Sequence, residues 1–414
     1  MSQQTIFTLE KLYQAYLDCR RTKRKTINAL KFEWNLEKNL FKLQKELETK
    51  IYRPGRSICF VVQEPSPREI FAASFRDRIV HHLLINEIEN AGEKEFIFDT
   101  YSCRKKKGTH LAIKRLREFI RKVTENNTSE AFYLQLDISG FFMAIDQNIL
   151  YSLFKKLSLR QGKSLTWEED ILWLAKIIIF HKPVENYIIK GNLALFKLIP
   201  PRKSLFYAQP NKGLPIGNYS SQFFANLYLN ELDQFVKRDL ICSQREQAHL
   251  RGERGCKYYV RYVDDFILLN KDIEKLKFVK EKIDLFLREK LLMELNLDKT
   301  KNQSINKGID FLGYFVKPNH ILIRRKVVIR LKNKLRIINS LNFYDTDTIK
   351  KIIAIINSYY GHFRHAYTFN LRKGIYEKYL DKLGCSFVPA LNYSFLKMKK
   401  MKNRKTEKIN IKFI

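Results

Sequence analysis

Two adjacent aspartates inside an apolar stretch constrain this sequence more than any other feature. Asp264 and Asp265 lie within residues 258–269, where aromatic and β-branched residues flank them on both sides. This pattern predicts two strands joined by a tight turn. Because neighbouring carboxylates are costly to bury without positive charge, we expect them to hold a divalent cation. The alternative is a surface hairpin with the acidic pair in its turn, although the apolar flanks disfavour an exposed ribbon.

The charge of the chain points to a polyanionic partner. Lys and Arg number 77 against 43 Asp and Glu, which gives a net charge of +34. Such an excess favours nucleic acid or an anionic membrane surface. The longest apolar run, residues 171–180, is too short to cross a membrane. The six cysteines have neither zinc-site nor disulfide spacing, and no signal peptide opens the chain. We therefore expect a cytoplasmic protein that binds nucleic acid and no membrane.

A third aspartate ends a second strand-like run. Residues 132–139 favour a strand that reaches Asp137, and Gly140 follows in a turn into a helix. An acid at a strand end beside a glycine turn suits a metal ligand next to backbone amides. A helix N-cap explains Asp137 equally well from these residues alone.

Two loops carry polar chemistry of their own. Residues 98–110 are dense in cations and hydroxyls, which suits contacts to a triphosphate or a nucleic-acid backbone. Glycines in residues 213–222 allow a ligand to approach the backbone closely. Taken alone, however, a core helix that begins with a glycine turn explains residues 213–222 at least as well.

Elsewhere the pattern is mostly helical, with short strands between the helices. His81 and His82 are adjacent on a predicted helix and point apart, which favours packing or phosphate contacts over a metal site. The expected helices cover residues 9–50, 75–89, 111–123, 213–236 and 272–291 and the basic chain beyond 324, and the expected strands cover residues 57–62, 69–73 and 308–315.

In their order, these motifs resemble those of reverse transcriptases over most of the chain. Asp137 occupies the place of the family's first metal-binding motif, and residues 262–265 resemble its Tyr-x-Asp-Asp box. Lys299 falls in the basic motif after the palm helix. Residues 311–314 resemble the hydrophobic grip beneath the primer. The resemblance implies an α+β right-hand polymerase, with an antiparallel palm sheet and a helical thumb.

The same resemblance divides the chain into three parts. Residues 1–130 would form an N-terminal helical extension and the fingers. Residues 131–320 would form the palm, with a fingers-side insertion at about 155–212. Residues 321–414 would form the helical thumb and a basic C-terminal tail.

The resemblance also implies the chemistry, which is RNA-templated DNA synthesis with two Mg²⁺ ions, or Mn²⁺ in their place. Phe142 matches the family's steric gate against a ribose 2′-hydroxyl. The implied catalytic residues are Asp137, Asp264, Asp265 and Lys299, and the implied metal ligands are Asp137, Ile138, Asp264 and Asp265. The implied nucleotide-binding residues are Phe142, Arg68, Arg104, Lys105, Ile216, Gly217 and Gln222, and the implied nucleic-acid-binding residues are Arg76, Arg78, Tyr262 and Gly313.

One departure narrows the resemblance. Many reverse transcriptases carry Gln-Gly and Ser-Pro where this chain has Ile216-Gly217 and Ser221-Gln222. The variant resembles enzymes of diversity-generating retroelements, which implies error-prone copying, especially opposite template adenine. It is also similar to antiphage-defence reverse transcriptases that work with a non-coding RNA, and less similar to group II intron enzymes.

The implied partners are an RNA template, a DNA or RNA primer and dNTPs, with an accessory protein or a second copy of the chain as further candidates. A hypothesis of another class is a non-catalytic RNA-binding scaffold with the same fold. The joint presence of Asp137, Asp264, Asp265, Phe142 and Lys299 argues against a scaffold.

Overall fold

The computed structural model describes residues 5–21, 23–64, 66–240, 256–340, 345–380 and 387–398. Contacts divide the chain into two compact units. The first contains residues 1–115 and 131–303, and the second contains residues 116–130 and 304–414. The chain passes from the first unit to the second within helix α5 (Thr109–Val123). Among the described residues, no helix has the length and apolar character needed to cross a membrane.

The first unit begins with three helices where the sequence predicted one helical region. These are α1 (Leu9–Arg20), α2 (Ile27–Glu33) and α3 (Leu36–Glu48). Leu40, Leu43 and Leu47 form the buried face of α3, as their spacing by threes and fours predicts. Both α1 and α2 pack against the longer helix α4 (Phe75–Glu95), which extends beyond the predicted end at residue 89.

A small sheet joins distant parts of the first unit. β1 (Ser57–Val62) pairs antiparallel with β2 (Arg68–Ala72), close to the predicted strands. On its other side β1 pairs in parallel with β4 (Tyr187–Ile189), a three-residue strand from the segment predicted as an insertion. That segment otherwise contains the end of α7 (Gln147–Leu159), α8 (Leu165–Ile179) and short 3₁₀ turns.

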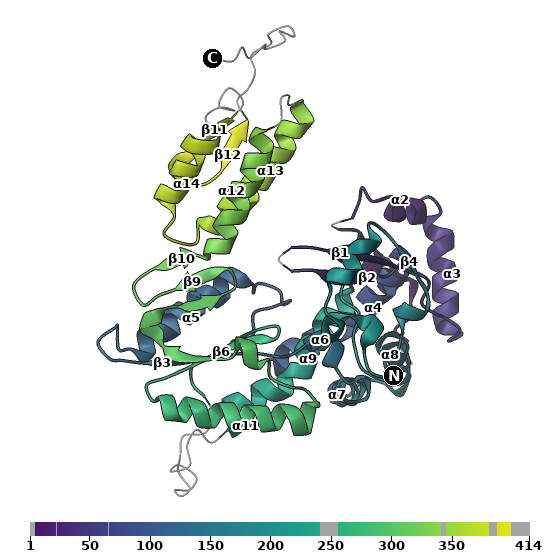
Figure 1. Ribbon diagram of the computed structural model, residues 1–414. Coiled ribbons are helices and arrows are strands. Elements are labelled where there is room, and N and C mark those ends of the chain that lie inside the picture. The colour runs from purple at the N-terminus through teal and green to yellow at the C-terminus, as the bar shows by residue number, and fades with distance from the viewer. Residues whose placement is uncertain are drawn as a thin grey trace, which may run out of the picture. The chain divides into compact units, whose positions relative to one another are not determined.

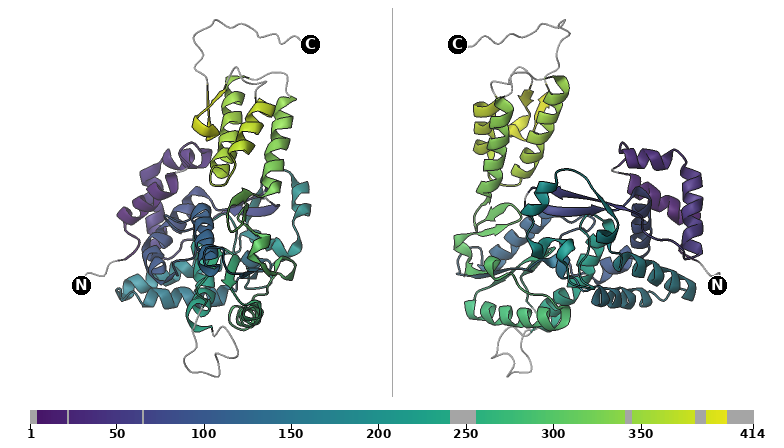
Figure 2. Two further views of the ribbon diagram at one scale, coloured as in Figure 1. Left: turned by 90° about the vertical axis from the view of Figure 1, so that its left-hand side faces the viewer. Right: turned by 45° about the vertical axis from the view of Figure 1, so that its right-hand side comes forward.

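A four-stranded sheet lies at the centre of the first unit, in the order β5-β6-β3-β7. Strand β6 runs antiparallel to both of its neighbours. Helix α11 packs against β3 and β6. It is the green helix below the sheet in Figure 2, seen end-on in the left view and from the side in the right view. The elements are β3 (Phe132–Asp137), β5 (Tyr259–Tyr262), β6 (Asp265–Asn270), β7 (Lys301–Ser304), α9 (Tyr219–Gln234) and α11 (Ile273–Leu291).

The second unit holds a short antiparallel sheet and a group of helices (Figure 1). Beyond residue 324 the sequence predicted helices alone, and the hairpin of β11 and β12 corrects that prediction. Most of the predicted Lys-rich tail, from residue 399 on, lies outside the described residues. The elements are β8 (Ile309–Phe311), β9 (Tyr314–Val316), β10 (Ile321–Ile323), α12 (Arg325–Asn339), α13 (Thr346–Phe363), α14 (Phe369–Ile375), β11 (Phe387–Pro389) and β12 (Leu396–Met398).

The predicted α+β class with an antiparallel central sheet is confirmed. Helices and antiparallel strands alternate along the chain, and the central sheet has helices packed against it. The three-part division at residues 130 and 320 stays a prediction.

Candidate active site

Three carboxylates lie at one end of the central sheet. Asp137 is the last residue of β3 and pairs with Asp265, the first residue of β6. Val263 and Asp264 form the two-residue turn between β5 and β6, where the sequence predicted the acidic bend. Among the described residues, no group of three or more acid, histidine or cysteine side chains is arranged as a complete metal site. A metal ion here would need backbone or substrate oxygens as well.

Burial shifts the pKa of both members of the acidic pair. Burial and, to a lesser extent, the neighbouring charge of Asp137 together raise the pKa of Asp264 to about 6, against the opposing charges of Lys299 and Arg68. Burial likewise raises the pKa of Asp265 to about 7, although Gln135 Nε2 donates to its Oδ1 at 3.2 Å and opposes the shift. Both shifts favour the neutral form, so a cation bound here would relieve an unfavourable electrostatic environment.

Asp137 already has a cationic partner. Lys299 Nζ donates to both carboxylate oxygens of Asp137, at 2.8 and 2.9 Å. Asn296 Nδ2 donates to Oδ2 at 3.0 Å, and the Asn296 backbone N–H donates to the Asp137 carbonyl at 2.8 Å. The short helix α6 (Phe141–Ala144) is preceded by Gly140 in the left-handed region, with φ of 55°. The N-cap interpretation of Asp137 is therefore wrong.

Further cations surround this carboxylate, and one of them was missed from the sequence. Arg68 begins β2 and is exposed. Burial lowers the pKa of Lys203, with contributions from the nearby cations Lys299, Arg202 and Arg68 and an opposing one from Asp137. Lys203 comes from a proline-bearing loop far from Asp137 in the chain, and its sequence gives no sign of this proximity.

A buried carboxylate fixes the loop that carries Lys203. Glu69 on β2 is 1% exposed and accepts hydrogen bonds from Ser204 Oγ at 2.8 Å and from the backbone N–H of Leu205. On the other side, a Cβ at Gly140 would lie 2.4 Å from the carbonyl oxygen of Arg202. The loop is thus held between β2 and the turn that follows Asp137.

The predicted nucleotide-binding turn before α9 lies against β2. The Ile216 carbonyl accepts from the backbone N–H of Phe71 at 2.8 Å. Gly217 has φ of +124°, and a Cβ there would lie 2.6 Å from Ile70 Cγ2, so this position requires glycine. Gln222 is exposed in the first turn of α9.

The predicted steric gate packs beside this turn. Phe142 is half-buried and makes an edge-to-face contact with Phe141, with ring centroids 5.2 Å apart. Its carbonyl accepts from the backbone N–H of Leu214 at 2.8 Å. The backbone of Ile138, the predicted carbonyl ligand, is bridged to Leu295 at the end of β3.

Arg104 and Lys105 have partners within the fold. Arg104 Nε and Nη2 donate to the carboxylate of Glu93, with hydrogen bonds of 2.8–3.0 Å. Its Nη1 donates to the carbonyls of Ile97 and Thr100 at 2.7 and 3.1 Å. Its side chain is 5% exposed. Lys105 pairs with Glu89. The nucleotide-binding roles of Arg104 and Lys105 stay predictions, and the contacts of Arg104 favour a structural role.

The two predicted nucleic-acid-binding arginines of α4 differ in their surroundings. Arg76 pairs with Glu46 and lies over the Tyr52 ring, 4.8 Å from its centroid. Arg78 is half-buried, burial lowers its pKa, and its Nε has no hydrogen-bond partner among the residues that the structure describes. Arg78 lines a pocket of about 200 Å³ together with Lys23 and other residues. A buried guanidinium facing a pocket favours an anionic ligand.

The remaining predicted residues are Tyr262 and Gly313. The Tyr262 hydroxyl accepts from Thr109 Oγ1 at 3.3 Å in the first unit. In the second unit Gly313 has φ of +87°, and a Cβ there would lie 3.2 Å from His362 Nε2. The His362 carbonyl accepts from the Tyr314 hydroxyl at 2.8 Å, which fixes the predicted grip against α13.

Packing, as the sequence favoured, explains the adjacent histidines. His81 Nδ1 lies 2.7 Å from Ser220 Oγ on α9. The His82 ring stacks on Tyr219, with centroids 4.5 Å apart.

Comparison with known proteins defines the class of this fold and site. Residues 63–316, more than half of the chain, match the family of reverse transcriptases (RNA-dependent DNA polymerases). The chain therefore belongs to the reverse transcriptase family, and its predicted class, a nucleotidyltransferase of the right-hand polymerase fold, is confirmed.

Particular relatives are similar at low identity. The chain is 23% identical to protein YkfC of Escherichia coli (strain K12) over 321 residues, which cover 72% of this chain and 75% of YkfC. It is 24% identical to the group II intron-encoded protein LtrA of Lactococcus lactis over 318 residues, 65% of this chain and 47% of LtrA. The chain thus spans about half the length of LtrA.

Among solved structures, an apo telomerase from Candida tropicalis is similar at a TM-score of 0.44 and 13% identity, over 74% of this chain and 52% of that chain. A likeness this distant carries no argument about function.

Proposed function

We propose that this chain copies RNA into DNA by metal-assisted phosphoryl transfer at Asp137 and Asp264. The observation that carries the proposal is the register of the central sheet, which puts the end of β3 beside the start of β6. Carboxylates from two adjacent strands thereby share one end of the sheet, where burial disfavours the charged forms of Asp264 and Asp265.

The residues present fit Mg²⁺ or Mn²⁺. The donors of Asp137, Asp264 and the Ile138 carbonyl are hard oxygens, and Mg²⁺ completes its shell with water and substrate phosphates. The raised pKa values of Asp264 and Asp265 show that the effect of burial outweighs that of the nearby cations. Two metal ions, when bound, would lower the pKa of the primer 3′-hydroxyl and neutralise the triphosphate. Asp265 would be a weaker or indirect ligand, because Gln135 already donates to it.

The other residues of the site have separate tasks in the proposal. Lys299, bound to Asp137 at rest, would turn to the triphosphate and assist the departure of pyrophosphate. Arg68 and Lys203 would bind phosphate oxygens. The charge of Arg68 already acts on the pKa of Asp264, and the charge of Lys299 acts on that of Lys203, so both cations lie near the site. Phe142 would exclude ribonucleotides by contact with the 2′-hydroxyl.

Primer extension on an RNA template, with Mg²⁺ or Mn²⁺ and dNTPs, tests the proposal. The wild-type chain should extend the primer, and the double variant Asp264→Ala, Asp265→Ala should lose extension while it still binds RNA. DNA synthesis by a folded double variant would contradict the assigned site. RNA binding without any extension by the wild-type chain would favour the non-catalytic scaffold.

For the biological role, we propose error-prone copying of the kind used by diversity-generating retroelements. The support is Ile216, whose carbonyl is held by β2 immediately before Gly217 and which replaces the glutamine common at this position. Sequencing of the cDNA should show errors concentrated opposite template adenine, and Ile216→Gln should reduce them. Accurate cDNA from the wild-type chain would favour the alternative, an antiphage-defence enzyme that works with a non-coding RNA.

A further inference from the structure

The turn that carries Asp264 is strained. Val263, the residue before Asp264, has φ of 56°, in the left-handed region. A β-branched residue rarely adopts this conformation, which is strained and persists only where the surrounding structure imposes it. A two-residue hairpin turn with positive φ at its first central position prefers glycine there. The direction of the Asp264 carboxylate depends on the Val263 peptide, so what imposes this conformation also orients the carboxylate.

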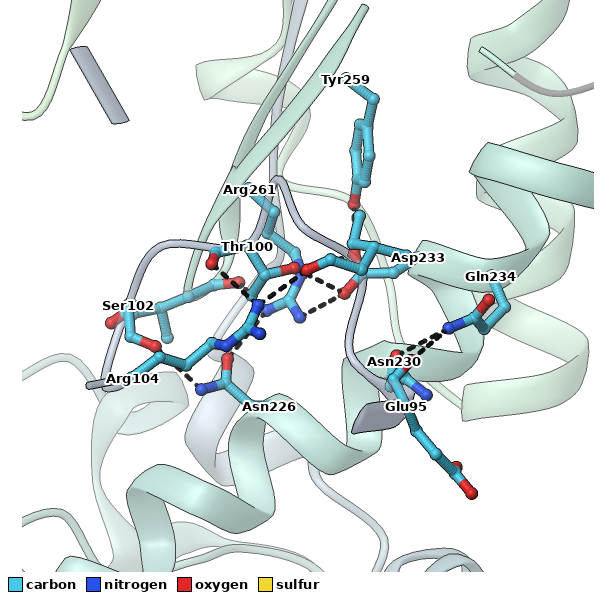
Figure 3. Close-up of polar contacts among 12 residues, drawn as sticks. Glu95, Thr100, Ser102, Arg104, Asn226, Asn230, Asp233, Gln234, Tyr259 and Arg261 are labelled. Carbon is cyan, nitrogen blue, oxygen red and sulfur yellow. Dashed lines mark hydrogen bonds and ion pairs between the residues drawn. The ribbon is translucent and has the colours of Figure 1, made fainter. Parts of the chain in front are cut away.

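A buried arginine on the same strand holds that peptide. Arg261 Nη1 donates to the Val263 carbonyl at 2.9 Å. Its Nε and Nη2 donate to Oδ1 and Oδ2 of Asp233 on α9, at 2.7 and 2.5 Å. Both side chains are fully buried. Figure 3 shows the guanidinium of Arg261 facing the carboxylate of Asp233. The planar guanidinium can serve both partners at once because its donors point in fixed directions.

The carboxylate of Asp233 is itself fixed on all sides. The Tyr259 hydroxyl donates to Oδ1 at 2.8 Å, and Thr100 Oγ1 donates to Oδ2 at 3.1 Å (Figure 3). The backbone of Arg261 also bonds to the segment around Thr100, since its N–H donates to the Asp99 carbonyl at 3.0 Å. The guanidinium therefore has little freedom to move away from the Val263 carbonyl.

The same pair connects α9 to the hairpin. Asn226, two turns before Asp233 on α9, donates to the Ser102 carbonyl at 2.9 Å, and its Oδ1 lies 3.5 Å from Arg261 Nη1. The helix begins two residues after Gly217, in the predicted nucleotide-binding turn. A buried ion pair is weak evidence for stability in itself, because apolar residues often serve as well. Its geometry here instead favours a role in orienting the hairpin.

We propose that Arg261 is a positioning residue, which with Asp233 holds the Val263 peptide left-handed and so orients the Asp264 carboxylate for metal binding. Arg261 is fully buried and acts through Val263. The inference rests on the proposed function of Asp264 and adds a residue that the Tyr-x-Asp-Asp box does not include.

Arg261→Lys is the first test. Lysine keeps the positive charge beside Asp233 but cannot fork onto the carboxylate and also reach the Val263 carbonyl. The Mg²⁺ concentration for half-maximal primer extension should rise about 10–100-fold, the usual effect of losing a group that orients a metal ligand. The KM for dNTP should change much less.

Val263→Gly in the Arg261→Lys background is the decisive variant. Glycine adopts positive φ without strain, so the hairpin no longer needs the arginine. The double variant should recover most of the lost Mg²⁺ affinity. A purely structural role of Arg261 predicts no recovery, because glycine at 263 restores no contact to Asp233. The absence of recovery, or an unchanged Mg²⁺ requirement in Arg261→Lys, would overturn the proposal.

Two controls separate this result from general loss of stability. Arg20→Lys weakens a remote arginine–carboxylate pair, in which Arg20 Nε donates to Glu33 Oε1 at 2.6 Å. Adding Val263→Gly to Arg20→Lys should not restore any stability that this variant loses. If Arg261→Lys is not recovered folded, the double variant with Val263→Gly should be. Failure of both to fold would assign the pair a structural role alone and overturn the proposal.

Direct Mn²⁺ binding, followed by the spectrum of the free ion, distinguishes this inference from the proposed function. A wild-type chain that extends no primer would refute the proposed function. Weaker Mn²⁺ binding in Arg261→Lys, restored by Val263→Gly, would still support the positioning role. Equal Mn²⁺ affinity in the wild type, Arg261→Lys and the double variant, or no Mn²⁺ binding by the wild type, would refute the positioning role of Arg261.

Discussion

Lys299 Nζ bonds to both carboxylate oxygens of Asp137, at 2.8 and 2.9 Å, so an ammonium stands where a metal ion would contact this acid. The side chain of Lys299 is 55% exposed, whereas that of Asp137 is 10% exposed. This exposed side chain can turn into water when a metal ion takes its place, because the ammonium is then hydrated and the buried carboxylate of Asp137 keeps a cationic partner. The lysine is therefore a displaceable partner of Asp137.

Lys299→Ala should change metal affinity and rate in opposite directions. Removal of the ammonium frees Asp137, so primer extension should reach half its maximum at a lower Mg²⁺ concentration. Loss of a group that assists pyrophosphate departure should lower the maximal rate, by about 10²-fold or more if it acts as a general acid. Single-turnover extension over a Mg²⁺ titration measures both effects.

Lys301→Ala is the matched control, since it removes an ammonium from the neighbouring strand β7. Both quantities should stay near wild-type values in this variant. An increase in the Mg²⁺ requirement of Lys299→Ala would show that the lysine supports metal binding and would contradict the displaceable role.

Local sequence patterns predicted the parts of the site that are encoded locally. The acidic turn after β5 follows from apolar flanks around two acids, and the N-cap of α11 follows from Asp272, which accepts from the backbone N–H groups of Glu274 and Lys275. The short strands β4, β7, β10, β11 and β12 were missed, because three or four residues are too few to show a period.

Contacts between distant segments could not be predicted. Charge alone suggested phosphate binding for Arg104, yet Glu93 and two carbonyls take up its donors. The segments around Arg261 and Asp233 give no sequence signal that the two residues pair, because only the packing of α9 against β5 brings them together. The position of Lys203 likewise depends on Glu69, which binds its loop from another strand.

Phe142→Ala should weaken discrimination against ribonucleotides. The ring is held by Phe141 and by the backbone bond to Leu214, so its truncation should open space at the sugar without moving the turn. The ratio of kcat/KM for dNTP over rNTP should fall about 10–200-fold, the usual range for one steric contact. Phe141→Leu, which loses the edge-to-face contact with the Phe142 ring, should lower this ratio less than Phe142→Ala does. An unchanged ratio in Phe142→Ala would exclude Phe142 as the gate.

Lys203→Ala should weaken dNTP use more than primer binding. An ammonium that binds a phosphate contributes about 1.5–3 kcal/mol, so kcat/KM for dNTP should fall about tenfold or more. Ser204→Ala, which loses the bond to Glu69, should give a smaller effect in the same direction. Lys197→Ala, an exposed lysine of the same segment, is the control and should have no effect. An equal loss in Lys203→Ala and Lys197→Ala would assign the effect to general charge.

Acid should unfold this protein partly through His81. Burial lowers the pKa of His81 to about 4, whereas an unfolded histidine titrates near 6.5. Below pH 6.5 His81 binds a proton in the unfolded chain, whereas in the folded chain it stays neutral down to about pH 4. The stability from neutral His81 is therefore fully present above pH 6.5 and is lost as the pH falls towards 4, by about 3 kcal/mol at most.

His81→Gln should flatten part of this pH dependence, because glutamine keeps a polar partner for Ser220 and does not titrate. Burial lowers the pKa of His82 to about 4 as well, so His81→Gln with His82→Gln should flatten it further. Urea unfolding at intervals from pH 4.5 to 7.5 measures the slope of the free energy of unfolding for each protein. Equal slopes in the wild type and both variants would contradict the assignment, since neither histidine would then differ in pKa between the folded and unfolded chains.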